Sequence, residues 1–279
     1  MPIEEIIRQD DLNQFPWQSI VTSVDTDTGE VLGRTSTYDD GTKTDQLLEN
    51  GVLRESFQSD NFDQFGQPLP GGGAKRWESI QTFYDAEGQP EFKTIIFDDG
   101  TRTDQRFENG VLRESFQSDN FDQFGQPLPG GGAKPWESIE TRFDANGDIE
   151  TRSITGDNGV QTEQFYTDGV LREFFQTDGF DLGETPPADG GVFDWRGKLT
   201  IYDADGSITS RGTVFDDDDQ IIFNYENAQI IERLRIDGDG DEDWLLSVTT
   251  YADTGPETVN YETLGDVPSQ YLEYFGVIA

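Results

Sequence analysis

Cysteine and histidine are both absent from this chain, and each absence removes a class of chemistry. Without cysteine there is no disulfide framework, no thiol nucleophile and no thiolate metal ligand. Without histidine there is no Ser-His-Asp or Cys-His nucleophile, no imidazole-bound zinc and no general base that titrates near neutral pH. Only carboxylates, Tyr, Lys and Ser remain for catalysis, so the composition favours a protein that is not an enzyme.

Basic residues are scarce. Lys and Arg together number 19 against 57 Asp and Glu, which gives a net charge of −38 and a pI near 4.1. Such a field repels nucleic acid, anionic lipid and acidic polysaccharide and attracts divalent cations and basic partners, so we expect no nucleic-acid partner. Three explanations of the acidity stay open: a surface suited to high or marine salt, a calcium-loaded protein, and a DNA mimic that blocks a nucleic-acid-binding protein.

Long hydrophobic runs are also missing. No stretch approaches the roughly 20 apolar residues that a membrane span requires, so we expect no membrane insertion. The first residues, Met-Pro-Ile-Glu-Glu, lack the basic and apolar regions of a secretory signal, which leaves cytoplasmic residence or export through another signal. Hydrophobic residues make up only 33% of the chain but aromatic residues 12%, which favours a folded, thin or elongated protein over a disordered one.

The most informative feature that is present is a tandem repeat. Residues 49–75 and 108–134 are the same 27 residues, ENGVLRESFQSDNFDQFGQPLPGGGAK. Weaker copies follow, and tryptophan marks the register at Trp17, Trp77, Trp136, Trp195 and Trp244. In such arrays each unit relies on its neighbours for burial, and the repeated surface is usually what the molecule offers to partners.

Each repeat has the sequence pattern of a four-stranded antiparallel meander. The second repeat reads WESIQTFYD, PEFKTIIF, TRTDQRF and VLRESFQSD, four runs rich in Thr, Ile, Phe, Tyr and Val. The last two junctions are Asp-Asp-Gly and Glu-Asn-Gly, and Asp-Gly and Asn-Gly pairs are strong hairpin signals because their turns need positive φ. In the fourth repeat the second turn becomes Asn227-Ala228, where the loss of glycine is expected to weaken the turn.

These patterns predict an all-β fold of tandem four-stranded β-meander repeats that form an elongated solenoid or twisted sheet, with a β-propeller of about five blades as the alternative. The predicted divisions are a leading segment or short helix at 1–16, repeats at 17–76, 77–135, 136–194 and 195–243, the last diverged, and a partial repeat with a C-terminal cap at 244–279. Within each repeat even the better strand face carries polar residues, so we expect neighbouring repeats to complete the burial.

Short turn motifs carry a resemblance to known repeat families. The turns Tyr84-Asp-Ala-Glu-Gly88 and Tyr202-Asp-Ala-Asp-Gly206 resemble the YD hairpin repeats of Rhs-type proteins. The order W-x-S-I, D-D-G, N-G-V-L-R-E is similar to hairpin repeats of large acidic RTX-type proteins of marine bacteria. This resemblance implies calcium binding and type I secretion, which reads a C-terminal signal; the RTX nonapeptide itself is absent from the chain.

One segment has the pattern of a metal-binding loop. In the sequence DGDGDED, four acidic residues alternate with others: Asp237, Asp239, Asp241 and Asp243. Carboxylates at alternate positions of a tight loop converge as the oxygen ligands of Ca²⁺ do. An EF-hand needs Gly at the sixth position and Glu at the twelfth, where this chain has Glu242 and Val248, so the loop is closer to the D-x-D-x-D calcium loops of FG-GAP-type or thrombospondin-type repeats. An acidic solvated turn is the alternative. The neighbouring run of four aspartates, 216–219, also needs relief of its repulsion, by a cation or by Arg211.

The connector between repeats is the candidate contact surface. Its proline and triple glycine exclude it from a sheet interior, and it holds apolar side chains in an exposed loop: Phe62, Phe65, Phe121 and Phe124. The tryptophans, one per repeat at a fixed strand position, are better explained by packing than by sugar stacking.

The functional hypothesis from these features is a non-enzymatic, extracellular or cell-surface structural or adhesive module, associated with calcium and exported by a route that reads a C-terminal signal. Repeated weak contacts to a cell-surface or matrix polysaccharide or protein, or to further copies of the chain, give avidity. Three alternatives are a spike or fibre of a phage-like particle (a virion location), a carbohydrate-active hydrolase on a propeller, and a DNA-mimicking inhibitor.

Overall fold

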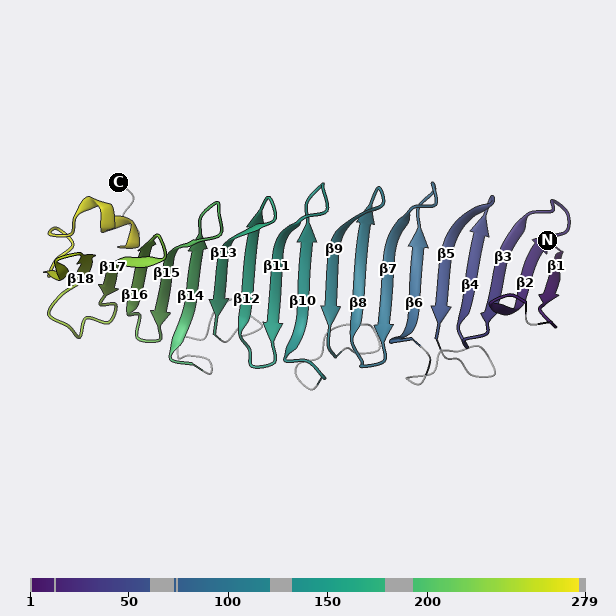
Figure 1. The fold of residues 1–279 in the computed structure, drawn as a ribbon, viewed down its shortest axis with the longest axis horizontal. Coiled ribbons are helices and arrows are strands. Elements are labelled where there is room, and N and C mark those ends of the chain that lie inside the picture. The colour runs from purple at the N-terminus through teal and green to yellow at the C-terminus, as the bar shows by residue number, and fades with distance from the viewer. Residues whose placement is uncertain are drawn as a thin grey trace. The chain divides into compact units, whose positions relative to one another are not determined.

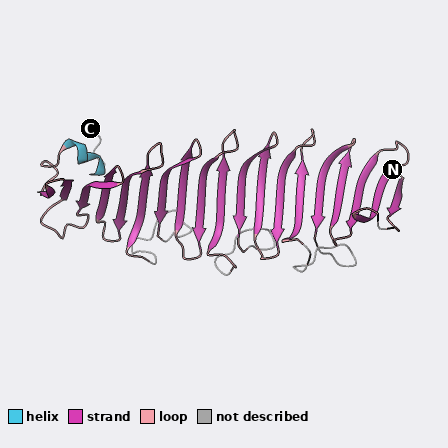
Figure 2. Cartoon of the chain, viewed as in Figure 1, coloured by secondary structure: helices cyan, strands magenta, loops and turns pink. Residues whose placement is uncertain are grey.

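The computed structural model describes residues 2–12, 14–60, 73, 75–120, 132–178 and 193–275. The fold is nearly all-β, as predicted, with 19 strands and one short 3₁₀ helix in the described residues (Figure 2). The chain divides into two compact units, Met1–Ile149 and Glu150–Ala279.

Unit 1 contains the first ten strands, which follow one another in chain order (Figure 1). They are β1 (Ile3–Gln9), β2 (Trp17–Asp25), β3 (Val31–Tyr38), β4 (Lys43–Glu49), β5 (Val52–Ser59), β6 (Trp77–Tyr84), β7 (Pro90–Phe97), β8 (Arg102–Glu108), β9 (Val111–Ser118) and β10 (Trp136–Phe143).

Unit 2 contains the other nine strands and the helix. They are β11 (Ile149–Gly156, whose first residue closes unit 1), β12 (Gln161–Thr167), β13 (Val170–Thr177), β14 (Trp195–Tyr202), β15 (Ile208–Phe215), β16 (Gln220–Glu226), β17 (Gln229–Ile236), β18 (Leu246–Ala252), β19 (Gly255–Tyr261) and η1 (Ser269–Phe275).

Each repeat begins at its tryptophan. Trp17, Trp77, Trp136 and Trp195 open β2, β6, β10 and β14, and the four runs expected in the second repeat are the strands β6 to β9. Phe15 stacks on Trp17, and Phe193 stacks on Trp195 in the same way, each with ring centroids 5.3 Å apart. Packing of the tryptophan is therefore observed at two of these strand starts.

The repeats join edge to edge within each unit. Pairing is antiparallel and runs from β1–β2 to β9–β10 in unit 1 and from β11–β12 to β18–β19 in unit 2. The last strand of one repeat pairs with the first strand of the next, as β5 pairs with β6 and β13 with β14. The tandem meander and the open sheet are therefore confirmed, whereas propeller blades would interrupt this pairing at each repeat boundary.

The predicted turn chemistry is present at the hairpins. Asn50-Gly51, Asn109-Gly110 and Asp168-Gly169 all have positive φ at both residues, as a primed two-residue turn requires. Asn227-Ala228 takes the same conformation, with φ of 51° and 62°. The turn thus forms without glycine, at the steric cost of an alanine in the left-handed region.

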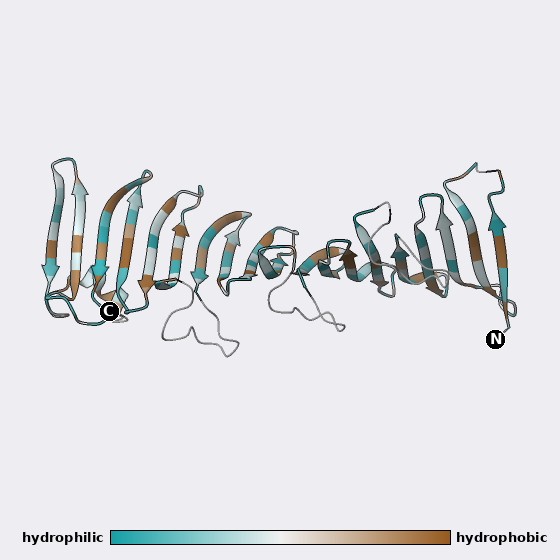
Figure 3. Ribbon diagram, turned by 90° about the horizontal axis from the view of Figure 1, so that it is seen from below, coloured by the Kyte–Doolittle hydropathy of each residue, from teal (hydrophilic) through white to brown (hydrophobic). Residues whose placement is uncertain are grey.

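The sheet of unit 1 is a single layer. Among the described residues its strands contact only their neighbours in the sheet, and apolar and polar residues alternate along them (Figure 3). Most buried side chains there are small and polar: Ser56, for example, is 5% exposed and lies between its cross-strand neighbours Gln46 and Thr82. Neighbouring repeats complete burial by extending the sheet sideways, not by packing face to face.

A conventional hydrophobic core is found near the end of unit 2. There η1 and the segment before it pack against the last strands, and the cluster consists of Ile222, Leu234, Ile236, Leu246, Val248, Val267 and Tyr271. Leu234 and Leu246 are fully buried. After the fourth repeat the described chain thus has two further strands, β18 and β19, and the helical cap η1.

Of the two alternatives for residues 1–16, a leading segment or a short helix, the short helix is wrong. Residues 3–9 form β1, because pairing with β2 satisfies their backbone groups and the isoleucines suit an extended strand. In the described residues no helix has the length and apolar character needed to cross a membrane.

Candidate functional site

The aspartate-rich loop predicted to bind calcium lies between β17 and β18 in unit 2. Asp237 directly follows β17 and is 7% exposed, whereas Asp239, Asp241 and Asp243 are exposed. Asp237 and Asp239 come together with Asp219, each offering a carboxylate oxygen within 4.8 Å of the other two. We call these three residues the acidic cluster. Among the described residues, Asp241 and Asp243 are not part of it.

Asp219 belongs to the hairpin tip between β15 and β16, where the sequence has its run of four aspartates. The run is evident in the sequence, but its proximity to the later loop depends on the pairing of β16 with β17. At this tip Arg196 forms an ion pair with Asp218, so the basic partner is Arg196 and not Arg211.

The acidic cluster concentrates negative charge. The charge of Asp239 is the main cause that raises the pKa of Asp241, with further contributions from desolvation and from other carboxylates nearby. Backbone N–H groups supply part of the compensation: Gly238 donates to Asp219 at 3.0 Å and Asp241 donates to Asp239 at 3.1 Å. Three converging carboxylates are suited to a hard divalent cation such as Ca²⁺.

Asp237 also has a structural role that recurs in every repeat. A buried aspartate follows the fourth strand of each repeat, at Asp60, Asp119, Asp178 and Asp237. Its N–H donates to a backbone carbonyl at or next to the first strand of the following repeat, at Glu78, Glu137, Arg196 and Leu245. Its carboxylate accepts N–H groups from the returning chain, at Lys75, Lys134, Phe193 and Gly240. This position therefore closes the connector in all four repeats.

The contact between the hairpin tip and the following loop, which brings Asp219 close to Asp239 in repeat 4, involves different side chains in the earlier repeats. In repeat 1 the end of the connector brings Lys75 to the hairpin tip, where its Nζ lies 2.7 Å from the carboxylate of Asp40. Lys134 and Asp99 repeat this contact at 2.7 Å in repeat 2. The hydrogen bond from Lys75 is the main cause that lowers the pKa of Asp40 to about 2.

In repeat 3 both partners change together, since Asn158 and Phe193 occupy the positions of the aspartate and the lysine. In repeat 4 the tip keeps its aspartates, but the shorter loop brings Asp239 to it instead of a lysine. Positive charge from the connector thus meets the tip in repeats 1 and 2, and negative charge meets it in repeat 4.

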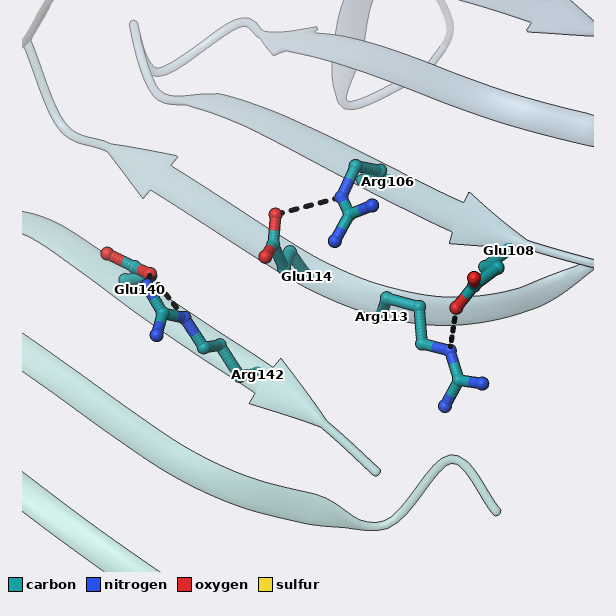
Figure 4. Close-up of polar contacts among 6 residues, drawn as sticks. All are labelled: Arg106, Glu108, Arg113, Glu114, Glu140 and Arg142. Carbon is teal, nitrogen blue, oxygen red and sulfur yellow. Dashed lines mark hydrogen bonds and ion pairs between the residues drawn. The ribbon is translucent and has the colours of Figure 1, made fainter. Parts of the chain in front are cut away.

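A second candidate surface is the charged strand face of unit 1 (Figure 4). Arg106 on β8 donates to Glu114 on β9 at 3.0 Å, and Arg142 on β10 lies opposite Glu114 in the register. The hydrogen bond from Arg106 is the main cause that lowers the pKa of Glu114. Arg142 also forms an ion pair with Glu140. The side chains of both ion pairs are about half exposed, so the charged groups across β8, β9 and β10 are accessible to a polar partner.

The four connector phenylalanines, Phe62, Phe65, Phe121 and Phe124, lie outside the described residues. Their proposed role as a contact surface therefore stays a prediction.

Two hollows are relevant to the hydrolase alternative. The larger, about 710 Å³, lies on the face of β13 to β16 beside Tyr274 in unit 2, and among its described lining residues there is no carboxylate. The smaller, about 470 Å³, lies in unit 1 between Trp77 and the tip residues Asp39 and Asp40. Asp40 is held ionised by Lys75, so it is unsuited to the role of a general acid.

No protein-family model and none of the curated proteins matches this sequence. Among solved structures, the periplasmic gluconolactonase of Pseudomonas aeruginosa aligns with a TM-score of 0.17 at 14% identity, over 93% of this chain and 97% of that chain. BamB from Moraxella catarrhalis aligns with a TM-score of 0.16 at 11% identity, over 94% of this chain and 89% of that chain. Likeness at this level carries no argument about function.

Proposed function

We propose that this chain is a non-enzymatic repeat protein of the cell surface or extracellular space, a structural or adhesive module that contacts its partner through successive repeats. The observation that carries the proposal is the repetition of one strand surface in one register. β5 and β9 have the same eight residues, and each pairs with the strand before it in the same way: Phe57 opposes Asp45, and Phe116 opposes Asp104.

Repetition of a half-exposed surface favours multivalent binding. Because the sheet of unit 1 is a single layer, its described strands have no second layer that would cover either face. A partner with its own repeating structure, such as a polysaccharide, can then occupy several equivalent sites, and the combined affinity exceeds that of one site by orders of magnitude. The net charge of −38 favours a neutral or basic partner over an acidic one.

The test is binding to immobilised dextran, mannan, cellulose and polylysine, with the full chain and a variant that lacks residues 77–135. This deletion puts Trp136 where Trp77 stood and so keeps the order of strands. We expect retention on at least one surface, and a drop in apparent affinity of about tenfold or more in the deletion variant. Equal retention of both proteins, or retention on none of the surfaces, would overturn the proposal. Release of reducing ends from a polysaccharide would instead support the hydrolase.

We also propose that calcium associates with the acidic cluster of unit 2. The support is the three-carboxylate geometry together with the contrast to repeats 1 and 2, where a lysine supplies positive charge to the equivalent tip. A cation bound by the native state raises the midpoint of thermal unfolding by mass action.

The measurement is thermal unfolding with CaCl₂, with EDTA, and with NaCl of matched ionic strength. We expect a rise specific to calcium that the Asp219→Asn and Asp239→Asn variants lose. Asp253→Asn, an exposed change in the β18–β19 hairpin, is the matched control and should keep the rise. A rise that NaCl reproduces would mean that calcium only screens the surface charge.

A further inference from the structure

β1 is the most exposed strand of unit 1, and it carries three exposed isoleucines. In the described residues β1 pairs with β2 on one side only, and all seven of its residues are exposed. Ile3, Ile6 and Ile7 are 59%, 46% and 60% exposed. An unpaired strand edge with exposed apolar side chains is a template for pairing with another chain.

The backbone of β1 shows which groups are free to pair. The N–H of Asp10 donates to the carbonyl of Gln18 on β2, and the carbonyl of Pro2 accepts the N–H of Thr26, the residue directly after β2. The even-numbered residues of this stretch therefore point their backbone groups towards β2. The N–H and C=O groups of the odd-numbered residues therefore point outwards. These residues are Ile3, Glu5, Ile7 and Gln9.

The edge of β1 lacks two of the features that usually block edge pairing. It contains no proline and no lysine. In unit 2, the comparable edge strand is β19, which contains Pro256. The carbonyl of Tyr261 accepts the N–H of Leu245, so the odd-numbered residues of β19 point their backbone groups inwards. The even-numbered residues, Pro256 among them, therefore point theirs outwards. Because proline has no N–H to donate, the outer edge of β19 is a poorer template for pairing with another strand than the outer edge of β1.

We propose that two copies of this chain pair through β1 in antiparallel fashion about a twofold axis centred on Ile6. Such an axis is perpendicular to the sheet, so facing residues must lie on the same face, and their numbers must be both even or both odd. Centred on Ile6, the register places Glu4 opposite the partner's Arg8, and Glu5 opposite the partner's Ile7. Opposite charges face each other twice, and Ile6 meets the partner's Ile6.

The neighbouring registers are less favourable. A shift that centres the pair on Glu5 puts Glu5 against the partner's Glu5. A shift that centres it on Ile7 puts Glu4 against the partner's Asp10. Like charges directly opposite each other destabilise a sheet, so charge selects the register centred on Ile6.

Chemical cross-linking tests the register directly, because the chain has no cysteine of its own. Ile6 faces itself as a non-hydrogen-bonded pair, with Cα atoms about 4.5 Å apart, within the range of about 4.4 to 6.8 Å that a disulfide spans. We expect the Ile6→Cys variant to form a disulfide-linked dimer under mild oxidation. The Ile3→Cys variant faces the partner's Gln9 and should remain monomeric under the same denaturing electrophoresis.

Sedimentation equilibrium at moderate salt, which screens the repulsion between two acidic chains, tests the association itself. The unaltered protein should show a monomer–dimer equilibrium. Ile7→Pro removes an outward N–H but leaves the pairing with β2 intact, and it should weaken association by at least about tenfold. Asn260→Pro, at an outward position of β19, is the matched control and should leave association unchanged.

A charge exchange separates pairing from a general structural effect. Arg8→Glu should weaken the dimer, and the double variant Glu4→Arg with Arg8→Glu should restore it. A monomeric unaltered protein, a failure of the double variant to restore association, or equal cross-linking of the Ile3→Cys and Ile6→Cys variants would overturn the proposal.

Discussion

At the scale of single residues, the buried aspartate after each fourth strand has the clearest structural role. Asp119 is 3% exposed, and its carboxylate accepts the N–H groups of Ala133 and Lys134 at 3.1 and 2.8 Å. A side chain built on Gly132 would begin 1.7 Å from that carboxylate, so glycine is required where the chain passes it. Part of the glycine-rich end of the connector is thereby explained by close approach to a buried charge.

We expect Asp119→Ala to lower the free energy of unfolding by about 1–3 kcal/mol, because two backbone donors lose their acceptor. Urea unfolding followed by circular dichroism measures the change. Glu91→Ala, an exposed position on β7, is the control and should have little effect. A null result for Asp119→Ala would show that water replaces the carboxylate at no cost.

The pair of Asp40 and Lys75 predicts a local pH dependence. The pKa of Asp40 is lowered to about 2, chiefly by the hydrogen bond from Lys75. A carboxylate whose pKa is depressed on folding contributes stability above its unfolded pKa near 4, and this contribution is lost as the pH falls towards 2. Lys75→Met should raise the pKa of Asp40 towards its ordinary value, as measured by NMR titration of the carboxyl carbon. Lys134→Met, which changes the equivalent pair of repeat 2, should leave Asp40 unchanged.

Only part of this residue-level chemistry can be predicted from the sequence. The alternation of Asp237, Asp239, Asp241 and Asp243 indicated an oxygen-rich loop, and two of the four lie in the acidic cluster. The third member, Asp219, joins them because β16 pairs with β17, a long-range fact that local spacing does not contain. The structural role of the buried aspartate after each fourth strand could not be predicted either, because the N–H groups that it accepts lie about 15 residues away or in a turn.

At the scale of the elements, strands and turns follow closely from local patterns. The hairpin positions were predictable because Asn-Gly and Asp-Gly pairs suit positive φ. The first strand was not, because the residues 3–9 have no turn signal before them and their strand state depends on pairing with β2. The edge-to-edge joining of repeats agrees with the predicted twisted sheet, although a meander pattern alone does not say whether its edges are shared.

The turn at Asn227-Ala228 gives a prediction at this scale. Ala228 has φ of 62°, a region that is unfavourable for residues with a Cβ atom. We expect Ala228→Gly to raise the free energy of unfolding by about 0.5–1 kcal/mol, the relief of strain less the entropy of the added glycine.

The reverse change in repeat 3 is the matched control. Gly169 has φ of 73° at the equivalent position, and a Cβ atom there would meet no atom within 4 Å, so only backbone strain is added. Gly169→Ala should therefore destabilise by a similar amount. If both changes had the same sign, turn strain would not be the cause.

At the scale of the whole molecule, the dominant quantity is charge. Even if every one of the 19 basic side chains paired with an acidic one, 38 of the 57 acidic side chains would remain without a basic partner. Close pairs such as Arg106 and Glu114 relieve repulsion locally, but they cannot balance the total. Repulsion among the remaining charges opposes the compact state.

We therefore expect the midpoint of thermal unfolding to rise as NaCl increases from low to physiological concentration, where the Debye length falls to about 8 Å. Circular dichroism in a series of NaCl concentrations measures this rise, and a non-ionic osmolyte such as sucrose separates screening from general solvent effects. A midpoint that falls with salt would mean that attractive pairs outweigh the net repulsion. Because screening acts on all the charges and calcium only where carboxylates converge, the Asp219→Asn variant should keep the NaCl response while it loses the calcium response.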